Sequence, residues 1–354
     1  MTRRLPRAFL LFSALCLFAV LASPGAGQER DPDARAPFQT RHGGPRMSVV
    51  ARARTGVLPK SVSVSPDGAT VAVCNFGRPD VEGVYLYDAA TLERIAEIPF
   101  SGNAVESVWS PDGKTLFVSN FRRDVVEVID VPTRTVRAEV ATGVHPKWMS
   151  LSPDGATLYV ANYGDRSISV VDVATLVELR RLPTLRHPRG MAVRNDGTLF
   201  AAAFRGDVLH VFSPGESEES ERWETCQLPR HVVSSPDGTT LYLSCSLGAV
   251  AFVDARSGRR FGTTLTGRNP RTIARNGDGR WIGVANFSSS DVTLIDTTLR
   301  RHREYEIPGA SGVVGLAMDP GPTPRIYVTS WNTAELIVLA ARPTIAAVAR
   351  PSDR

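Results

Sequence analysis

The tetrapeptide Ser65-Pro66-Asp67-Gly68 recurs along the chain and decides its fold. Three further copies are Ser110-Pro111-Asp112-Gly113, Ser152-Pro153-Asp154-Gly155 and Ser235-Pro236-Asp237-Gly238. Degenerate copies are Arg194-Asn195-Asp196-Gly197 and Asn276-Gly277-Asp278-Gly279, and a seventh, weakly matching copy lies near Asp319-Pro320-Gly321. Proline fixes φ and glycine accepts positive φ, so each copy suits a tight turn. Because the turn glycines from 68 to 279 recur every 41 to 45 residues, the sequence is built from repeats.

Each repeat contains four short runs of β-branched and apolar residues between turn signals. In the third repeat these runs are 148–151, 157–161, 167–171 and 179–182. Runs of this length and composition are typical of strands. Four strands in a period near 42 residues form one propeller blade. The sequence therefore predicts an all-β, seven-bladed β-propeller with four-stranded blades over residues 46–342.

The two ends of this region complement one another. The seventh repeat supplies three strands, at 314–318, 325–329 and 335–339, and lacks a fourth. An extra strand is indicated at 47–54, ahead of the first repeat. We expect this N-terminal strand to complete the last blade, which would leave no blade edge open to aggregation.

The second and third strands of the repeats carry recurring motifs. Tyr159-Val160-Ala161-Asn162 and Phe117-Val118-Ser119-Asn120 stand in the second strand, and Ser169-Val170-Val171-Asp172 stands in the third. Over about residues 46–342 the chain resembles the YVTN family of seven-bladed propellers. That family includes surface-layer-like and periplasmic proteins, many without a known activity. Related propellers include lactonases and quinoprotein subunits, so the resemblance implies a fold and leaves the function open.

Residues 1–28 have the organisation of a secretory signal peptide. Arg3, Arg4 and Arg7 precede an apolar run at 8–22, and small residues follow. The run is shorter than the about 20 residues that a membrane span needs. We therefore predict export to the periplasm or the extracellular space, with an uncleaved membrane anchor as the alternative.

The chain without its signal peptide is nearly neutral. The 41 basic and 36 acidic residues give +5, and removing three arginines leaves 38 against 36, or +2. This balance argues against nucleic-acid or membrane-surface binding by overall charge. Residues 29–45 are expected to be a polar linker, and 343–354 a C-terminal tail.

Five repeats place a proline and a basic residue just before the first strand. The basic residues are Lys60, Lys147, Arg189, Arg230 and Arg271. The second and seventh repeats have Val105 and Val314 at this position, and Glu106 stands beside Val105. The first strand of a blade is innermost, so the five cations should converge at the top of the channel and attract an anion. The alternatives are pairing with neighbouring carboxylates, or mere repetition through duplication.

The second strand often ends in asparagine followed by an aromatic residue. The asparagines are Asn75, Asn120, Asn162 and Asn286, followed by Phe76, Phe121, Tyr163 and Phe287. Variants are Ala203-Phe204, Cys245-Ser246 and Ser330-Trp331. Amides and ring faces could line the same ligand pocket. The alternative is packing between blades, with asparagine capping backbone groups.

Histidines and cysteines suggest two further features of this face. His145 and His187 occupy equivalent positions in adjacent repeats and could hold a metal, but no ligand stands at a recognisable spacing beside them. We therefore predict neither a metal nor a cofactor. Cys226 lies in the loop before the fifth blade and Cys245 ends its second strand, so a disulfide is predicted, with Cys74 left free.

These patterns favour a binding or scaffold protein of the cell envelope, with a basic funnel for a small anion or an envelope protein. The alternative is a propeller enzyme of the lactonase or quinoprotein-associated kind. Common catalytic motifs are absent from the sequence, and Glu106 with His145 or Arg189 is the only candidate pair for catalysis. Nucleic-acid binding is a third hypothesis, disfavoured by the near-neutral charge and the export signal.

Overall fold

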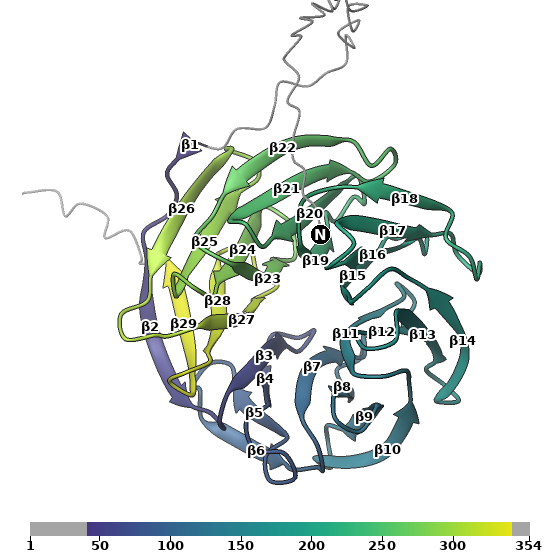
Figure 1. Ribbon diagram of the computed structural model, residues 1–354. Helices are drawn as coiled ribbons and strands as arrows, with labels where there is room; N and C mark the ends of the chain where they lie inside the picture. Colours follow the sequence, from purple (N-terminus) through teal and green to yellow (C-terminus); the bar gives the residue numbers. More distant parts are fainter. Residues whose placement is uncertain (1–40, 342–354) are drawn as a thin grey trace, which may run out of the picture. The chain divides into compact units, whose positions relative to one another are not determined.

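The computed structural model describes residues 41–341, which form seven sheets arranged around a central axis, antiparallel except for one short edge strand (Figure 1). From inner to outer strand, the first three blades are β3 (Pro59–Val64), β4 (Thr70–Asn75), β5 (Val84–Asp88) and β6 (Arg94–Ile98); β7 (Ala104–Trp109), β8 (Thr115–Asn120), β9 (Val125–Asp130) and β10 (Thr135–Ala141); and β11 (Pro146–Leu151), β12 (Thr157–Asn162), β13 (Ser167–Asp172) and β14 (Val177–Pro183). The next two are β15 (Pro188–Val193), β16 (Leu199–Ala203), β17 (Val208–Phe212) and β18 (Glu221–Glu224); and β19 (Pro229–Ser234), β20 (Thr240–Cys245), β21 (Ala249–Asp254) and β22 (Arg260–Leu265). The last two are β23 (Pro270–Arg275), β24 (Trp281–Asn286), β25 (Asp291–Asp296) and β26 (Arg301–Glu306); and β27 (Val313–Met318), β28 (Arg325–Ser330), β29 (Glu335–Ala341) and β2 (Met47–Arg54).

The predicted seven-bladed propeller is confirmed. Each innermost strand contacts the innermost strands of both neighbouring blades, and β27 contacts β3 to complete the ring. The predicted closure is also present, because β2 pairs antiparallel with β29 from Met47 opposite Ala341 to Arg54 opposite Glu335. The chain therefore begins and ends its ring within one sheet.

The sixth blade has a fifth strand that the repeats did not predict. β1 (Arg41–His42) pairs in parallel with the outer strand β26. The predicted signal peptide at 1–28, most of the predicted linker and the tail at 343–354 lie outside the described residues. Residues 41–341 contain no helix long and apolar enough to cross a membrane.

The recurring tetrapeptides form the turns between the first and second strands. In the first blade, Gly68 has a φ of 74° and its N–H donates to Ser65 O at 2.9 Å. The Ser65 hydroxyl donates to Asp67 Oδ1 at 2.5 Å and accepts from Thr70 N–H at 2.9 Å. A side chain that satisfies the turn in this way fixes where the second strand begins, and so fixes the register of each blade.

The core lies between successive blades. Phe117 and Val126 of the second blade pack with Met149, Leu158 and Val160 of the third, all at most 1% exposed. Fully burying one such side chain stabilises a fold by about 1.5–3 kcal/mol. Packing of this kind around the whole ring holds the innermost strands at fixed positions about the central axis.

Candidate functional site

The innermost strands share an irregularity near their first residues. In all seven blades the pairing between the first and second strands shifts register there, for example between Pro146 and Met149. Such a bulge redirects side chains that regular alternation would send to opposite faces. Lys147 and Trp148, which are adjacent in the chain, consequently both line one funnel at the top of the axis. Here the top is the face that carries the starts of the innermost strands.

The funnel brings together all five predicted cations. Its walls are Lys60, Val105, Glu106, Lys147, Trp148, Arg189, Gly190, Arg230, His231, Arg271, Thr272 and Val314. They enclose a cavity of about 40 Å³, which holds a few water molecules or one small anion. The two valines stand in the blades that lack the cation, as the sequence indicated.

Aromatic rings contact each of the five cations. Lys147 Nζ lies 4.3 Å from the Tyr163 ring centroid, and the Arg271 guanidinium lies 3.6 Å from that of Phe287. Arg189 and Arg230 lie 5.0 and 4.6 Å from the Phe204 centroid. Lys60 lies 5.4 Å from that of Trp331. The aromatic rings that follow the second strands therefore stabilise the charged forms of the funnel's basic side chains, because an aromatic face attracts a cation.

The cations have few polar partners within the described chain. None of the five forms an ion pair with any carboxylate of residues 41–341. Arg230 donates from Nε to the Ser246 hydroxyl at 2.7 Å, whereas Arg271 Nε is buried without a hydrogen-bond partner there. Positive charge that protein carboxylates leave unpaired is available to an anion.

Burial and mutual repulsion act on these groups together. The pKa of Lys60 falls well below its ordinary value because of burial, reinforced by the charges of Arg189 and Arg271. Burial and the charge of Arg189 also hold the pKa of Lys147 well below its usual range. The negative charge of a bound anion would oppose both the burial and the repulsion between the cations. Anion binding should therefore raise the pKa of the two lysines and favour their protonated forms.

Glu106 is the only carboxylate among the residues that line the funnel. Burial raises its pKa to about 8, and the positive charge of Lys60 opposes that rise. A carboxyl with this pKa carries a proton for part of the time at neutral pH. Titration of Glu106 therefore changes the net charge of the funnel within the physiological pH range.

Trp148 and His231 lie beneath the cations with their ring centroids 3.6 Å apart. His231 is 4% exposed, and its Nδ1 accepts a hydrogen bond from Ile273 N–H at 3.0 Å. Burial, aided by Arg189, lowers the pKa of His231 to about 3, so its neutral ring carries the proton on Nε2. Trp148 Nε1 and His231 Nε2 are both buried with no hydrogen-bond partner among residues 41–341. Trp148 was not among the predicted site residues, although it follows Lys147 as His231 follows Arg230.

The four predicted asparagines lie outside the funnel. Asn75, Asn120, Asn162 and Asn286 are fully buried, and their amides bond to the chain itself. Asn75 Oδ1 accepts from Gly56 N–H at 3.1 Å, and Asn162 Nδ2 donates to the Ser167 and Ser169 hydroxyls at 2.9 Å. Asn75 and Asn120 thus cap backbone N–H groups, the role that was the alternative to ligand binding, whereas Asn162 and Asn286 bond to side chains of their own blades. None of the four lines the funnel, and we leave them out of the site.

His145 and His187 also lie outside the funnel. Their rings stack on Phe121 and Tyr163, each with centroids 4.3 Å apart. Residues 41–341 contain no group of three histidine, cysteine, aspartate or glutamate side chains arranged to hold a metal ion. These two histidines therefore extend the aromatic packing around the cations.

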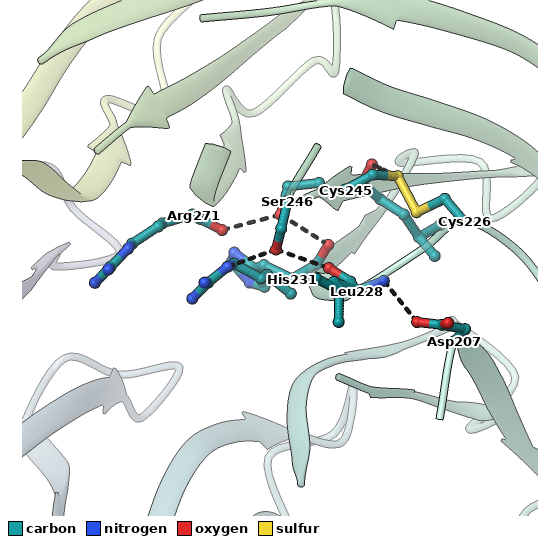
Figure 2. The surroundings of a disulfide bond; sticks show 10 residues. Asp207, Cys226, Leu228, His231, Cys245, Ser246 and Arg271 are labelled. Atoms are coloured by element: carbon teal, nitrogen blue, oxygen red, sulfur yellow. Dashed lines mark hydrogen bonds between the residues drawn. A yellow bond between two sulfur atoms is a disulfide. The ribbon is translucent and has the colours of Figure 1, made fainter. Parts of the chain in front are cut away.

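A disulfide joins Cys226 and Cys245 beside the funnel, with 6.0 Å between their Cα atoms (Figure 2). Ser246 follows Cys245, and its hydroxyl donates to Leu228 O at 2.9 Å (Figure 2). The same hydroxyl accepts from Arg230 Nε at 2.7 Å. The disulfide therefore anchors the segment that positions Arg230. Cys74 is buried and has a free thiol.

Removal of this disulfide by the C226S/C245S double substitution should lower the free energy of unfolding by about 3 kcal/mol, since it closes a loop of moderate length. The measurement is denaturant unfolding with and without reductant. The parent protein should lose stability on reduction, whereas the double variant should not respond. A parent protein that is equally stable in both conditions would contradict the prediction.

The fold and the funnel together define a seven-bladed β-propeller with a basic pocket at one end of its axis. Residues 61–218 match the family model described as "Lactonase, 7-bladed beta-propeller". Among solved structures, the chain is similar to one titled "Kuenenia stuttgartiensis Hydrazine Synthase", with 21% identity and a TM-score of 0.70 over 81% of this chain and 97% of that one. No curated protein matches the sequence. The structural match concerns the fold alone, and the family match supports a β-propeller.

Proposed function

We propose that this protein is an exported binding protein of the cell envelope that holds a small anion, or an anionic group of an envelope protein, in its basic funnel. The observation that carries the proposal is the convergence of five cations that no carboxylate of residues 41–341 pairs. The signal-like residues 1–28 and the resemblance to YVTN propellers support the location. The balanced charge of the chain favours such a ligand over nucleic acid.

The test is calorimetric titration of the chain lacking residues 1–28 with acetate, chloride, sulfate and phosphate. We expect one binding site, because the cations surround a single cavity of about 40 Å³. A polyanion would instead give an affinity that falls steeply with salt, with a slope that grows with the number of phosphates contacted. Absence of binding by all four anions would overturn the small-anion proposal.

The anion affinity should fall as the pH rises through about 8, the pKa of Glu106. Below that pH the protonated carboxyl is neutral, whereas above it the carboxylate repels an anion. The lysines, whose pKa values are lowered, change the affinity in the same direction as they lose protons. E106Q should weaken this dependence and raise the affinity at high pH by about 10-fold, the equivalent of one pKa unit. Exposed Glu93 supplies the control variant E93Q, which should leave the pH profile unchanged.

A propeller enzyme that hydrolyses lactones is the second candidate, supported by the family match over residues 61–218. Glu106 lies in the same funnel as Arg189, and a carboxyl with a pKa near 8 could move protons beside a group that stabilises developing negative charge. If the protein is a lactonase, it should hydrolyse at least one member of a panel of lactones, and E106Q should abolish that activity. Anion binding without turnover would leave the binding protein as the function.

A further inference from the structure

Six aromatic residues form a collar around the funnel, one from every blade except the fifth. Each follows the second strand of its blade, and its backbone N–H donates, at 3.0 or 3.1 Å, to the carbonyl just before the innermost strand of the same blade. This repeated bond holds the six at equivalent positions. All are half-buried, so part of each side chain stays accessible to a ligand. The collar consists of Phe76, Phe121, Tyr163, Phe204, Phe287 and Trp331.

The cations gather on one side of the funnel. Consecutive blades from the third to the sixth supply Lys147, Arg189, Arg230 and Arg271. The seventh, first and second blades instead supply Val314, Lys60 and Val105, so this second side has two valines and one cation. Glu106 lies on the second side and carries a proton for most of the time below a pH of about 8. The funnel therefore offers one side to a negative charge and a less charged side to the group that bears it.

Three rings of the collar form a continuous apolar surface beside the less charged side. The Phe76 ring lies between two others, with its centroid 5.9 Å from that of Trp331 and 6.0 Å from that of Phe121. These rings come from the seventh, first and second blades, which also supply the two valines. Lys60 Nζ lies 5.4 Å from the Trp331 centroid, so this surface borders the funnel directly. Accessible rings beside a few convergent polar groups are typical of small-molecule sites.

The size of the funnel limits how much of a ligand can enter it. Its cavity of about 40 Å³ takes a carboxylate or an ion of similar size, whereas a benzene ring fits in a cavity of roughly 150 Å³. The remainder of a larger ligand must therefore lie outside the cavity, against the collar. An aromatic ring suits this surface best, because ring pairs attract one another beyond what burial of their area provides.

We propose that the funnel binds a carboxylate joined by a short link to an aromatic ring, with the carboxylate among the cations and the ring against Phe76, Phe121 and Trp331. This inference rests on the proposed function, because it names the ligand class of the same site. It differs from that function in what it requires. The funnel alone binds any small anion, whereas the collar makes the protein select anions that carry a ring.

Calorimetric titration with acetate, phenylacetate and phenylacetamide, at an ionic strength of about 0.1 M, tests the ligand class. Phenylacetate should bind at least about 10-fold more tightly than acetate, because its ring buries apolar surface against the collar. Phenylacetamide should bind at least about 10-fold more weakly than phenylacetate, because it lacks the charge. Equal affinity of phenylacetate with either compound, beside clear binding of sulfate, would overturn this inference and leave the proposed function standing. Absence of binding by acetate, sulfate and phenylacetate would overturn both.

The variant F76A tests the collar, since Phe76 is the middle ring of the three and does not line the cavity. It should lower the ratio of phenylacetate to acetate affinity at least about 5-fold, and F76L, which keeps apolar bulk without a ring face, at least about 2-fold. F261A is the matched control, because it removes a half-buried ring from the outer strand β22 and should change the ratio by less than about 2-fold. Near-ultraviolet circular dichroism identifies the folded variants. An unchanged ratio in a folded Phe76 variant would refute the role of the collar.

A partner protein that ends in phenylalanine would present the same chemistry as a free acid. Acetyl-trialanyl-phenylalanine is therefore the second probe, since it carries the same ring and carboxylate at the end of a peptide. Tighter binding by this peptide than by phenylacetate would assign the ligand to the C-terminus of a partner. Equal or weaker binding would assign it to a free aromatic acid.

Discussion

Replacing Arg189 and Arg230 together with glutamine is expected to weaken sulfate binding at least about 100-fold, since each hydrogen bond to a charged group contributes about 1.5–3 kcal/mol. The two residues stand near the starts of adjacent innermost strands, and both guanidinium groups contact the same aromatic ring, that of Phe204, at 5.0 and 4.6 Å from its centroid. Glutamine keeps much of the side-chain volume but removes the charge and the guanidinium donors. Calorimetric titration with sulfate at an ionic strength of about 0.1 M measures the loss directly.

An equal change of net charge elsewhere controls for long-range attraction. Arg259 and Arg260 are exposed residues beside the outer strand of the fifth blade, so R259Q/R260Q removes the same charge far from the funnel walls. This variant should keep its sulfate affinity within about 2-fold, because salt screens exposed charges over about 10 Å. An equal loss of affinity in both variants would show that the whole protein's field, and no particular pocket, attracts the anion.

The fold could be predicted because its signals are local. Serine, aspartate and glycine in each tetrapeptide close a turn by bonds among themselves, so the copies mark the blades without reference to distant residues. Closure by β2 was predictable for the same reason, from a strand missing at one end and a spare strand at the other. The short parallel strand β1 pairs through two residues and leaves no comparable pattern.

The candidate site was only partly predictable because it depends on side-chain direction. The five cations converge because the repeat places each at the start of an innermost strand. The register shift that sends both Lys147 and Trp148 into the funnel is a property of the pairing, which residue types do not specify. Asn162 and Tyr163 illustrate the same limit. The two residues are adjacent, but the Asn162 amide donates hydrogen bonds to Ser167 and Ser169, whereas the Tyr163 ring contacts Lys147 in the funnel.

A chain that begins at Gly56, and so lacks β2, is expected to lose its cooperative fold or to melt more than about 10 °C lower. Without β2, the edge of β29 would be open beside Leu336, Ile337, Val338 and Leu339, which are now at most 1% exposed. The bond from the Tyr87 hydroxyl to Arg54 O at 2.7 Å and the Arg52–Glu335 ion pair at 3.0 Å would also be lost. Thermal unfolding and size-exclusion chromatography measure the two outcomes, because an open hydrophobic edge promotes aggregation.

A chain that begins at Arg46 is the matched comparison, since it lacks β1 but keeps all of β2. β1 pairs through only Arg41 and His42, both exposed, so its loss should lower the melting temperature by no more than about 3 °C. The difference between the two truncated chains then isolates the contribution of β2. If both melt at the same temperature, the last blade is stable with three strands, and the packing of β27 and β28 against β3 suffices to close the ring.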